Sequence, residues 1–163
     1  MKDHSQYISW MKHMKSTGKM LERNRWIIDT IKGVKKDEEI FLQTSNFILI
    51  TNGTWKSTDD IDQMHLLCFY DNRKIRTIRD LKQTDVNILK MMRDESLNVI
   101  QERFGVNKDE LRVFFHYPPS TYILHIHFVH INSSESAEWN EWSFDHVLNC
   151  LESENNYFKN VRM

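Results

Sequence analysis

The chain has 163 residues, 40% hydrophobic and 28% charged, which is enough for one globular domain with a buried core. Its formal net charge of −1 excludes the strong basic character of proteins that coat long nucleic acids. No segment has the apolar length needed to cross a bilayer. Cys68 and Cys150 lie in apolar runs without CxxC spacing, as reduced structural thiols do. We therefore expect a soluble protein of the cytoplasm or the nucleus, with a small ligand and no membrane partner.

The start of the chain is predicted to be helical. Up to Gly33, methionine, tryptophan, isoleucine and leucine recur at helical spacing among lysines and arginines, as one long helix or two. We assign residues 1–33 to an N-terminal helical segment and residues 34–163 to the main domain.

The main domain alternates between strand and helix patterns. Strands are predicted at 39–43, 46–50, 64–70, 111–117 and 121–131. Between the third and fourth strands lies an amphipathic helix, capped by Thr84 and closed by Gly105. A second helix at 144–151 precedes a polar tail. Strands grouped around an isolated crossover helix indicate an α+β fold with an antiparallel sheet of about five strands.

Four histidines lie between residues 116 and 131, around the turn Pro118-Pro119-Ser120. Side chains alternate along a strand, so His125 and His127 share the face opposite the apolar core positions. His116 ends the preceding strand and can join them across a hairpin. His130 falls on the core face and is left out of the predicted site.

The paired histidines allow two alternatives to a catalytic role. Histidines two residues apart on a strand can bind a metal, but zinc needs a third or fourth ligand, and no Cys, Asp or Glu lies close in sequence. His65 could supply one, although nothing in the sequence places it there. Histidines also occur on half-exposed strands without any function. We predict no metal or other cofactor.

The segment resembles the histidine-triad motif of the scavenger mRNA decapping enzymes, in which a His-x-x-Pro-Ser turn leads into a His-x-His-x-His strand. His116, Pro119 and Ser120 match the turn, and His125 and His127 match the second and third histidines of the strand. The similarity extends over roughly residues 20–151 and includes the stretches WIIDTIKG, NFILI, IRTIRDL and VIQERFGVNKDELRVFFHY. It corresponds to the family's C-terminal domain, and we expect no counterpart of the large N-terminal domain.

The resemblance implies a histidine-triad fold and a pyrophosphatase acting on the 7-methylguanosine cap of a dinucleotide or short capped RNA. On this basis His125 is the nucleophile that forms a phosphohistidine intermediate. The resemblance assigns His127, His116 and the Ser120 hydroxyl to phosphate contacts. It also implies a homodimer.

The same resemblance predicts where the methylated base would bind. Trp26 falls close to the family's base-stacking tryptophan, where an indole would lie over the cationic methylguanine. Glu38, from the acidic cluster at 37–39, would accept hydrogen bonds from the guanine edge. Asn52 lies in the turn that follows the second predicted strand and completes the predicted base site.

Two departures from the family pattern leave three hypotheses. Ile123 replaces the first histidine of the triad, and Gly53 and Thr54 stand where the family has a leucine and a lysine that contact the base and phosphates. The chain is therefore an active cap hydrolase with a reduced site, a cap-binding module that has lost turnover, or a histidine-triad hydrolase with another nucleotide substrate. We favour the first, because the nucleophile, its neighbour and the Pro-Ser turn are all retained.

Overall fold

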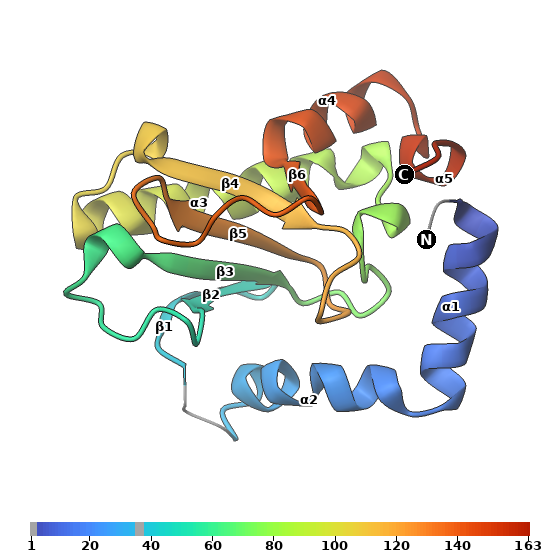
Figure 1. Ribbon diagram of the computed structural model, residues 1–163, viewed down its shortest axis with the longest axis horizontal. Helices are drawn as coiled ribbons and strands as arrows, with labels where there is room; N and C mark the ends of the chain where they lie inside the picture. Colours follow the sequence, from blue (N-terminus) through green and yellow to red (C-terminus); the bar gives the residue numbers. More distant parts are fainter. Residues whose placement is uncertain (1–2, 35–37) are drawn as a thin grey trace.

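The computed structural model describes residues 3–34 and 38–163 as an α+β fold (Figure 1). The helices are α1 (His4–Ser16), α2 (Lys19–Ile31), α3 (Val86–Phe104), α4 (Phe144–Ser153) and α5 (Tyr157–Asn160). The strands are β1 (Ile40–Gln43), β2 (Phe47–Thr51), β3 (His65–Tyr70), β4 (Leu111–His116), β5 (His125–His130) and β6 (Glu141–Ser143). Across these two described ranges, no helix combines the length and apolar character that a membrane span requires.

The strands form one six-stranded antiparallel sheet in the order β1-β2-β3-β5-β4-β6. The short edge strand β6 is additional to the strands predicted from the sequence. Helix α3 is the crossover connection, since it joins β3 to β4 and both of these strands pair with β5. Three strands that are distant in sequence are thereby placed side by side, with β5 in the middle.

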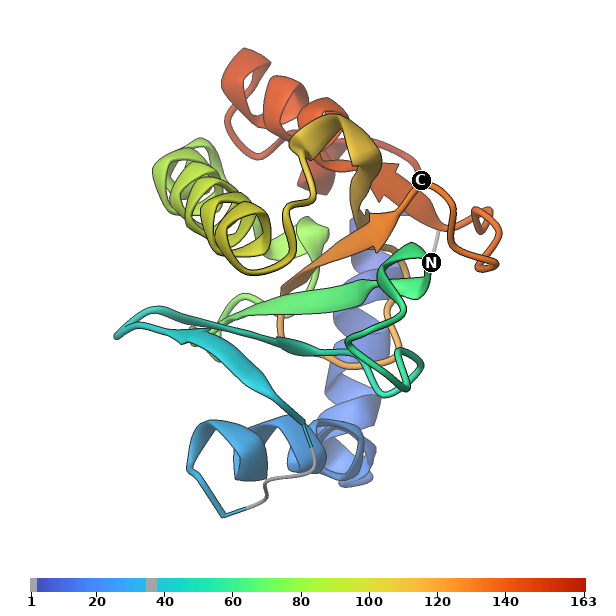
Figure 2. The same ribbon diagram turned by 90° about the vertical axis from the view of Figure 1, so that its left-hand side faces the viewer.

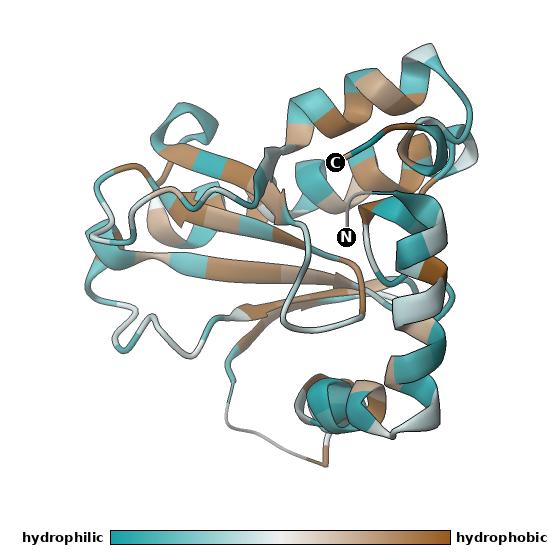
Figure 3. Cartoon of the chain, turned by 45° about the vertical axis from the view of Figure 1, so that its right-hand side comes forward, coloured by the Kyte–Doolittle hydropathy of each residue, from teal (hydrophilic) through white to brown (hydrophobic). Residues whose placement is uncertain are grey.

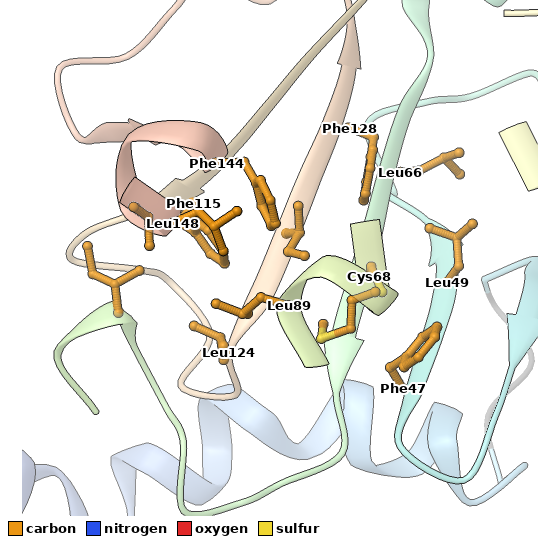
Figure 4. Close-up of a cluster of buried hydrophobic side chains, with 14 of the residues drawn as sticks. Phe47, Leu49, Leu66, Cys68, Leu89, Phe115, Leu124, Phe128, Phe144 and Leu148 are labelled. Atoms are coloured by element: carbon orange, nitrogen blue, oxygen red, sulfur yellow. The ribbon is translucent and has the colours of Figure 1, made fainter. Parts of the chain in front are cut away.

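One face of the sheet carries the main hydrophobic core. Helices α3 and α4 lie over this face (Figure 2). The labelled side chains in Figure 4 include Leu66 and Cys68 from β3, Phe128 from β5 and Phe144 from α4, packed together between sheet and helices. The predicted alternation along β5 is confirmed, because its even-numbered apolar side chains belong to this core. Both cysteines are buried and form no disulfide, as predicted.

Helix α2 covers part of the opposite face (Figure 2). Ile27 of α2 is fully buried against alternate side chains of the sheet, namely Ile48, Ile50, Leu67 and Phe69. The part of this face that lies beyond α2 holds His125 and His127 of β5.

The N-terminal segment is two helices, one of the two forms predicted. Gly18 breaks the helical run with φ of +72°, a left-handed conformation in which glycine is favoured. Figure 3 shows that α1 and α2 carry mostly hydrophilic residues, whereas the sheet strands are mostly hydrophobic. The division of the chain at residue 33 stays a prediction.

The predicted N-terminal cap of the crossover helix was wrong, because a short turn separates Thr84 from the helix. Thr84 lies inside a 3-10 turn, Gln83–Asp85, that precedes α3, and it does not cap the helix. The Asp85 carboxylate instead accepts the backbone N–H of Lys82 at 2.8 Å. The predicted end is confirmed, because Gly105 closes α3 with φ of +69° and donates its N–H to Gln101.

The predicted strand over residues 121–131 was too long, since β5 begins only at His125. The backbone of Tyr122 is hydrogen-bonded to a side chain of α2 and not to a neighbouring strand. Its N–H donates to Asn24 Oδ1 at 2.8 Å, and its carbonyl accepts from Asn24 Nδ2 at 3.1 Å. The segment before β5 is therefore hydrogen-bonded to α2 through Tyr122.

The polar tail predicted from the sequence is in fact packed against the domain. Phe158 of α5 is fully buried. The buried guanidinium of Arg79 donates to the carbonyls of Phe158 and Val161 at 2.7 and 2.9 Å. Capture of these two carbonyls by a buried cation holds the C-terminal segment on the domain.

Candidate functional site

The structure brings the predicted site residues together on the face of the sheet beside α2. Six of them line one cavity of about 240 Å³, and these are Trp26, Glu38, Asn52, Ser120, His125 and His127. His116 lines a neighbouring cavity of about 380 Å³, together with His65 and Glu135. The His116 and His127 ring centroids are 4.3 Å apart, so the row of histidines connects the two cavities.

His125 is held in a single tautomer by its own strand. Its Nδ1 lies 2.8 Å from the carbonyl oxygen of Ile123, which can only accept a hydrogen bond. Nδ1 therefore carries the proton, and Nε2 keeps its lone pair. Phe69 stacks on the ring with a centroid distance of 4.6 Å. A neutral imidazole with a fixed, unprotonated Nε2 is a competent nucleophile.

Burial keeps His125 neutral over a wide pH range. Loss of solvent around the ring lowers its pKa from 6.5 to about 4, although the hydrogen bond to Ile123 opposes the shift. We expect the neutral ring to be lost only as the pH falls through about 4. Because the folded pKa lies below the unfolded value, His125 should also reduce the stability of the fold as the pH falls below about 6.5.

This pH dependence can be measured by following the ring protons of His125 by NMR, with the His125→Asn variant used to identify its signals. The expected midpoint is near pH 4. A midpoint near 6.5 would show that the ring is fully hydrated and that its environment does not favour the neutral form.

His127 lies between the other aromatic rings of the site. Its ring stacks on Phe114 from β4 at 4.9 Å and lies 4.8 Å from the ring of His125. Burial, followed by the positive charges that neighbouring histidines can carry, lowers its pKa well below the ordinary value. Its Nε2 is buried and has no hydrogen-bond partner among residues 3–34 and 38–163. A water molecule can fill that position whichever ring nitrogen carries the proton, whereas a phosphoryl oxygen can do so only if Nε2 is protonated.

His65 belongs to this site, although the sequence did not place it there. Its Nε2 lies 3.0 Å from His127 Nδ1, because pairing of β3 with β5 puts the two rings diagonally opposite on one face. Its Nδ1 lies 2.8 Å from a carboxylate oxygen of Glu135, another residue not predicted. Burial lowers the pKa of His65 and outweighs the opposing charge of Glu135.

The predicted base-binding side chains form the far wall of the first cavity. Trp26 is half-buried, meets Phe69 edge-on at 5.5 Å, and donates its indole N–H to Thr121 Oγ1 at 3.3 Å. Glu38 accepts a hydrogen bond from Thr51 at 3.1 Å. Gly53 lies beside Glu38, since a Cβ added there would be 3.7 Å from the Glu38 carboxylate.

Of two further positions, one lies at the rim of the cavity and the other falls outside the part of the chain that the structure describes. Asp37, of the same acidic cluster as Glu38, lies outside the described residues. Ser120 is exposed at the rim of the cavity, where its carbonyl oxygen lies 3.5 Å from Arg23 Nη1.

Ile123, which replaces the first triad histidine, is part of an apolar cluster. Its side chain is 1% exposed and packs with Ile27 and Leu67 in the cluster under α2. A histidine there would bury polar nitrogens without an evident partner. We expect Ile123→His to lower the free energy of unfolding by about 1–3 kcal/mol.

Chemical denaturation would measure this loss, with Ile131→His as the matched control because Ile131 is 54% exposed. Equal stabilities of the two variants would contradict the expectation.

The histidines of the site were also considered as ligands of a metal ion. Among residues 3–34 and 38–163, no group of three or more His, Cys, Asp or Glu side chains is arranged to hold a metal ion. The histidines contact one another and Glu135 along the sheet surface.

The six-stranded antiparallel sheet, its crossover helix and the row of histidines define a histidine-triad fold. Two solved structures share it, both described as HIT family hydrolases. The one from Clostridium thermocellum has a TM-score of 0.53 and 13% identity, and covers 69% of this chain and 95% of that one. The one from Legionella pneumophila has a TM-score of 0.52 and 16% identity, over 68% and 93% of the two chains.

Sequence comparison identifies the family. The model described as "Scavenger mRNA decapping enzyme C-term binding" matches residues 25–142. The chain therefore belongs to the scavenger mRNA decapping enzyme family, as the motif predicted.

Curated relatives include two nematode proteins named m7GpppX diphosphatase. The one from Ascaris suum is 31% identical over 72% of this chain and 41% of the relative. The one from Caenorhabditis elegans is 28% identical over 82% and 45%. A human protein of the same name is 30% identical over 64% of this chain and 32% of the relative. The chain thus spans less than half the length of these relatives.

Proposed function

We propose that the protein is a nucleotide pyrophosphatase that hydrolyses the 7-methylguanosine cap of a dinucleotide or short capped RNA. The observation that carries the proposal is the His125 ring, whose Nδ1 is committed to the Ile123 carbonyl while the ring lines a cavity shared with Trp26. The relatives named m7GpppX diphosphatase support the choice of substrate.

The first step follows from the tautomer of His125. Its Nε2 attacks the phosphorus next to the methylated nucleoside, and the bond from that phosphorus to the bridging oxygen breaks. The leaving nucleotide departs with the electron pair on a phosphate oxygen and needs no proton. The new N–P bond makes the ring cationic, and its Nδ1–H remains hydrogen-bonded to the Ile123 carbonyl, which stabilises the charge.

The second step is hydrolysis of the phosphohistidine. Water attacks the phosphorus, the N–P bond breaks, and its electron pair returns to His125. The products are 7-methylguanosine monophosphate and the regenerated neutral ring. Splitting the displacement into two steps in this way lets an imidazole perform the reaction with no bound cofactor.

The base would occupy the cavity wall formed by Trp26, Glu38 and Asn52. An indole face attracts a cationic methylguanine more strongly than a neutral guanine. A volume of about 240 Å³ is at the small end for ligand sites, so the cavity suits the methylated nucleoside and its first phosphate better than a whole dinucleotide.

The test is hydrolysis of methylated cap dinucleotide in ¹⁸O-labelled water, with products resolved by mass spectrometry. We expect the label in 7-methylguanosine monophosphate, because water attacks the phosphorus retained on His125. Label in the other nucleotide would overturn the proposed site of attack. Preference for dinucleoside polyphosphates or nucleoside phosphoramidates would indicate the third hypothesis.

One observation favours a second candidate, a cap-binding module without turnover. Ile123 is buried in an apolar cluster and supplies no hydrogen bond to phosphate. Calorimetry with cap analogue would then show binding, while long incubation with cap dinucleotide would give no product.

We propose a homodimer as the assembled form, as the resemblance implies. Sedimentation of the purified chain tests this, and a monomer at micromolar concentration would contradict it.

A further inference from the structure

A chain of hydrogen bonds leads from a partly exposed carboxylate to the buried ring of His127. Glu135 Oε2 lies 2.8 Å from His65 Nδ1, and His65 Nε2 lies 3.0 Å from His127 Nδ1. The three groups come from the loop after β5, from β3 and from β5. None of the motifs in the sequence links them.

The chain fixes which nitrogens carry protons. An ionised carboxylate only accepts hydrogen bonds, so Glu135 requires the proton of His65 to be on Nδ1. A neutral His65 then has a lone pair on Nε2, which accepts from His127 Nδ1 at 3.0 Å and also lies 3.1 Å from the Asn52 amide nitrogen. His127 is left with an unprotonated Nε2, the nitrogen for which the described part of the chain provides no hydrogen-bond partner. In this state the ring offers the substrate a lone pair and not a proton.

The backbone around Glu135 is held in place from two sides. Arg112 of β4 donates to the Glu135 carbonyl oxygen at 2.8 Å, and the neighbouring Ser134 donates its hydroxyl to Gln63 Oε1 at 2.7 Å. Partial burial raises the pKa of Glu135, but hydrogen bonds from Thr54 and His65 outweigh this effect and lower it. Glu135 is therefore ionised at neutral pH.

We propose that Glu135 and His65 are positioning residues that make His127 the proton acceptor for hydrolysis of the phosphohistidine on His125. The inference rests on the proposed function and assigns its second step. The arrangement is that of a carboxylate orienting a histidine in nucleophilic catalysis, extended by one further imidazole.

The proton that this step releases passes through His127 and His65 before it reaches solvent. As the water oxygen bonds to phosphorus and the N–P bond breaks, one water proton moves to His127 Nε2. The Nδ1 proton of His127 then shifts toward His65 Nε2, which places the positive charge next to Glu135. Product release and loss of the proton to solvent restore the starting state.

The charges that face His127 come from each element packed against it. His65 lies on β3, His116 on β4 and His125 on β5 itself, and each lowers the pKa of His127 when protonated. Glu135 on the following loop provides the opposing charge through His65. The carboxylate therefore compensates for the cost of protonating a buried histidine cluster.

The first test is spectroscopic and needs no turnover. Two-bond ¹H–¹⁵N NMR correlation of labelled histidines reports which ring nitrogen is protonated. In the wild type we expect His127 to be protonated on Nδ1. In Glu135→Gln the amide can donate to His65 Nδ1, which would move the His127 proton to Nε2. An unchanged His127 tautomer would overturn the inference.

The second test separates the two chemical steps. Glu135→Gln should leave the first burst of product intact but slow steady-state turnover by about tenfold, so that phosphohistidine accumulates. His65→Gln should have a similar effect, and the double variant should be no slower than either single variant. A structural defect would reduce the burst and the steady state together.

The control is Asp62→Asn, because the Asp62 carboxylate lies 3.6 Å from His130 Nδ1, on the other face of the same strand. The Asp62→Asn variant should leave both the burst of product and the steady-state turnover unchanged. Equal kinetics of Glu135→Gln and Asp62→Asn would overturn the inference while the proposed function stood. Absence of product from the wild type would overturn the proposed function, and the NMR test would still decide the tautomer.

Discussion

Replacing His125 with asparagine is expected to reduce release of 7-methylguanosine monophosphate by on the order of 10⁴-fold or more. The reason is the loss of Nε2, the only atom of the side chain with a lone pair free for phosphorus. The asparagine amide can still donate to the Ile123 carbonyl, so the fold should be retained. Quantitative product analysis with cap dinucleotide, together with a thermal unfolding curve, measures both effects.

The matched control is His130→Asn on the same strand. His130 Nδ1 accepts the backbone N–H of Asn132 at 3.2 Å, and an asparagine oxygen can accept that bond instead. This variant should therefore turn over at the wild-type rate. Turnover of His125→Asn within about tenfold of the control would show that His125 is not the nucleophile.

Local periodicity accounts for several of the predicted site residues that lie close together in the structure. Alternation along β5 was enough to separate His125 and His127 from the core, and the hairpin brought His116 within reach of them. Placement of Trp26 depended on the family resemblance, because a tryptophan on an amphipathic helix is more often a core residue.

His65 could not be placed from the sequence because its role comes from strand order, and Glu135 lies in a loop that no motif linked to the site. The crossover through α3 places β3 next to β5, so a histidine 62 positions before His127 becomes its neighbour. The sequence does show that His65 shares a strand face with Leu67 and Phe69 and is a polar residue in an otherwise apolar strand. Without the strand order, that position had no identifiable partner.

The boundaries that failed were set by hydrogen bonds to side chains. Asn24 takes the backbone groups of Tyr122 away from the sheet and shortens β5, and Asp85 forms the turn that displaces Thr84 from the helix cap. Secondary-structure propensity and hydrophobic periodicity predict element boundaries only where backbone groups are hydrogen-bonded to other backbone groups.

Trp26→Ala is expected to lower kcat/KM for methylated cap by about 10²-fold and to have a smaller effect on unmethylated dinucleotide. Loss of base stacking removes about 1–3 kcal/mol for either substrate. Loss of the attraction between an indole and a cationic base removes up to about 2 kcal/mol more, and only for the methylated one. Trp26 is half-buried and its edge is held by Thr121, so the ring is already oriented before substrate binds.

Parallel measurement of kcat/KM for both substrates isolates the part that depends on the methyl group. Trp26→Phe should fall between the wild type and Trp26→Ala, because a phenyl ring stacks but has a weaker negative face. Trp139→Ala is the control, since Trp139 is 88% exposed on the loop after β5. Equal losses for methylated and unmethylated substrate would show that Trp26 only supports the cavity wall, and that recognition of the cap's positive charge occurs elsewhere.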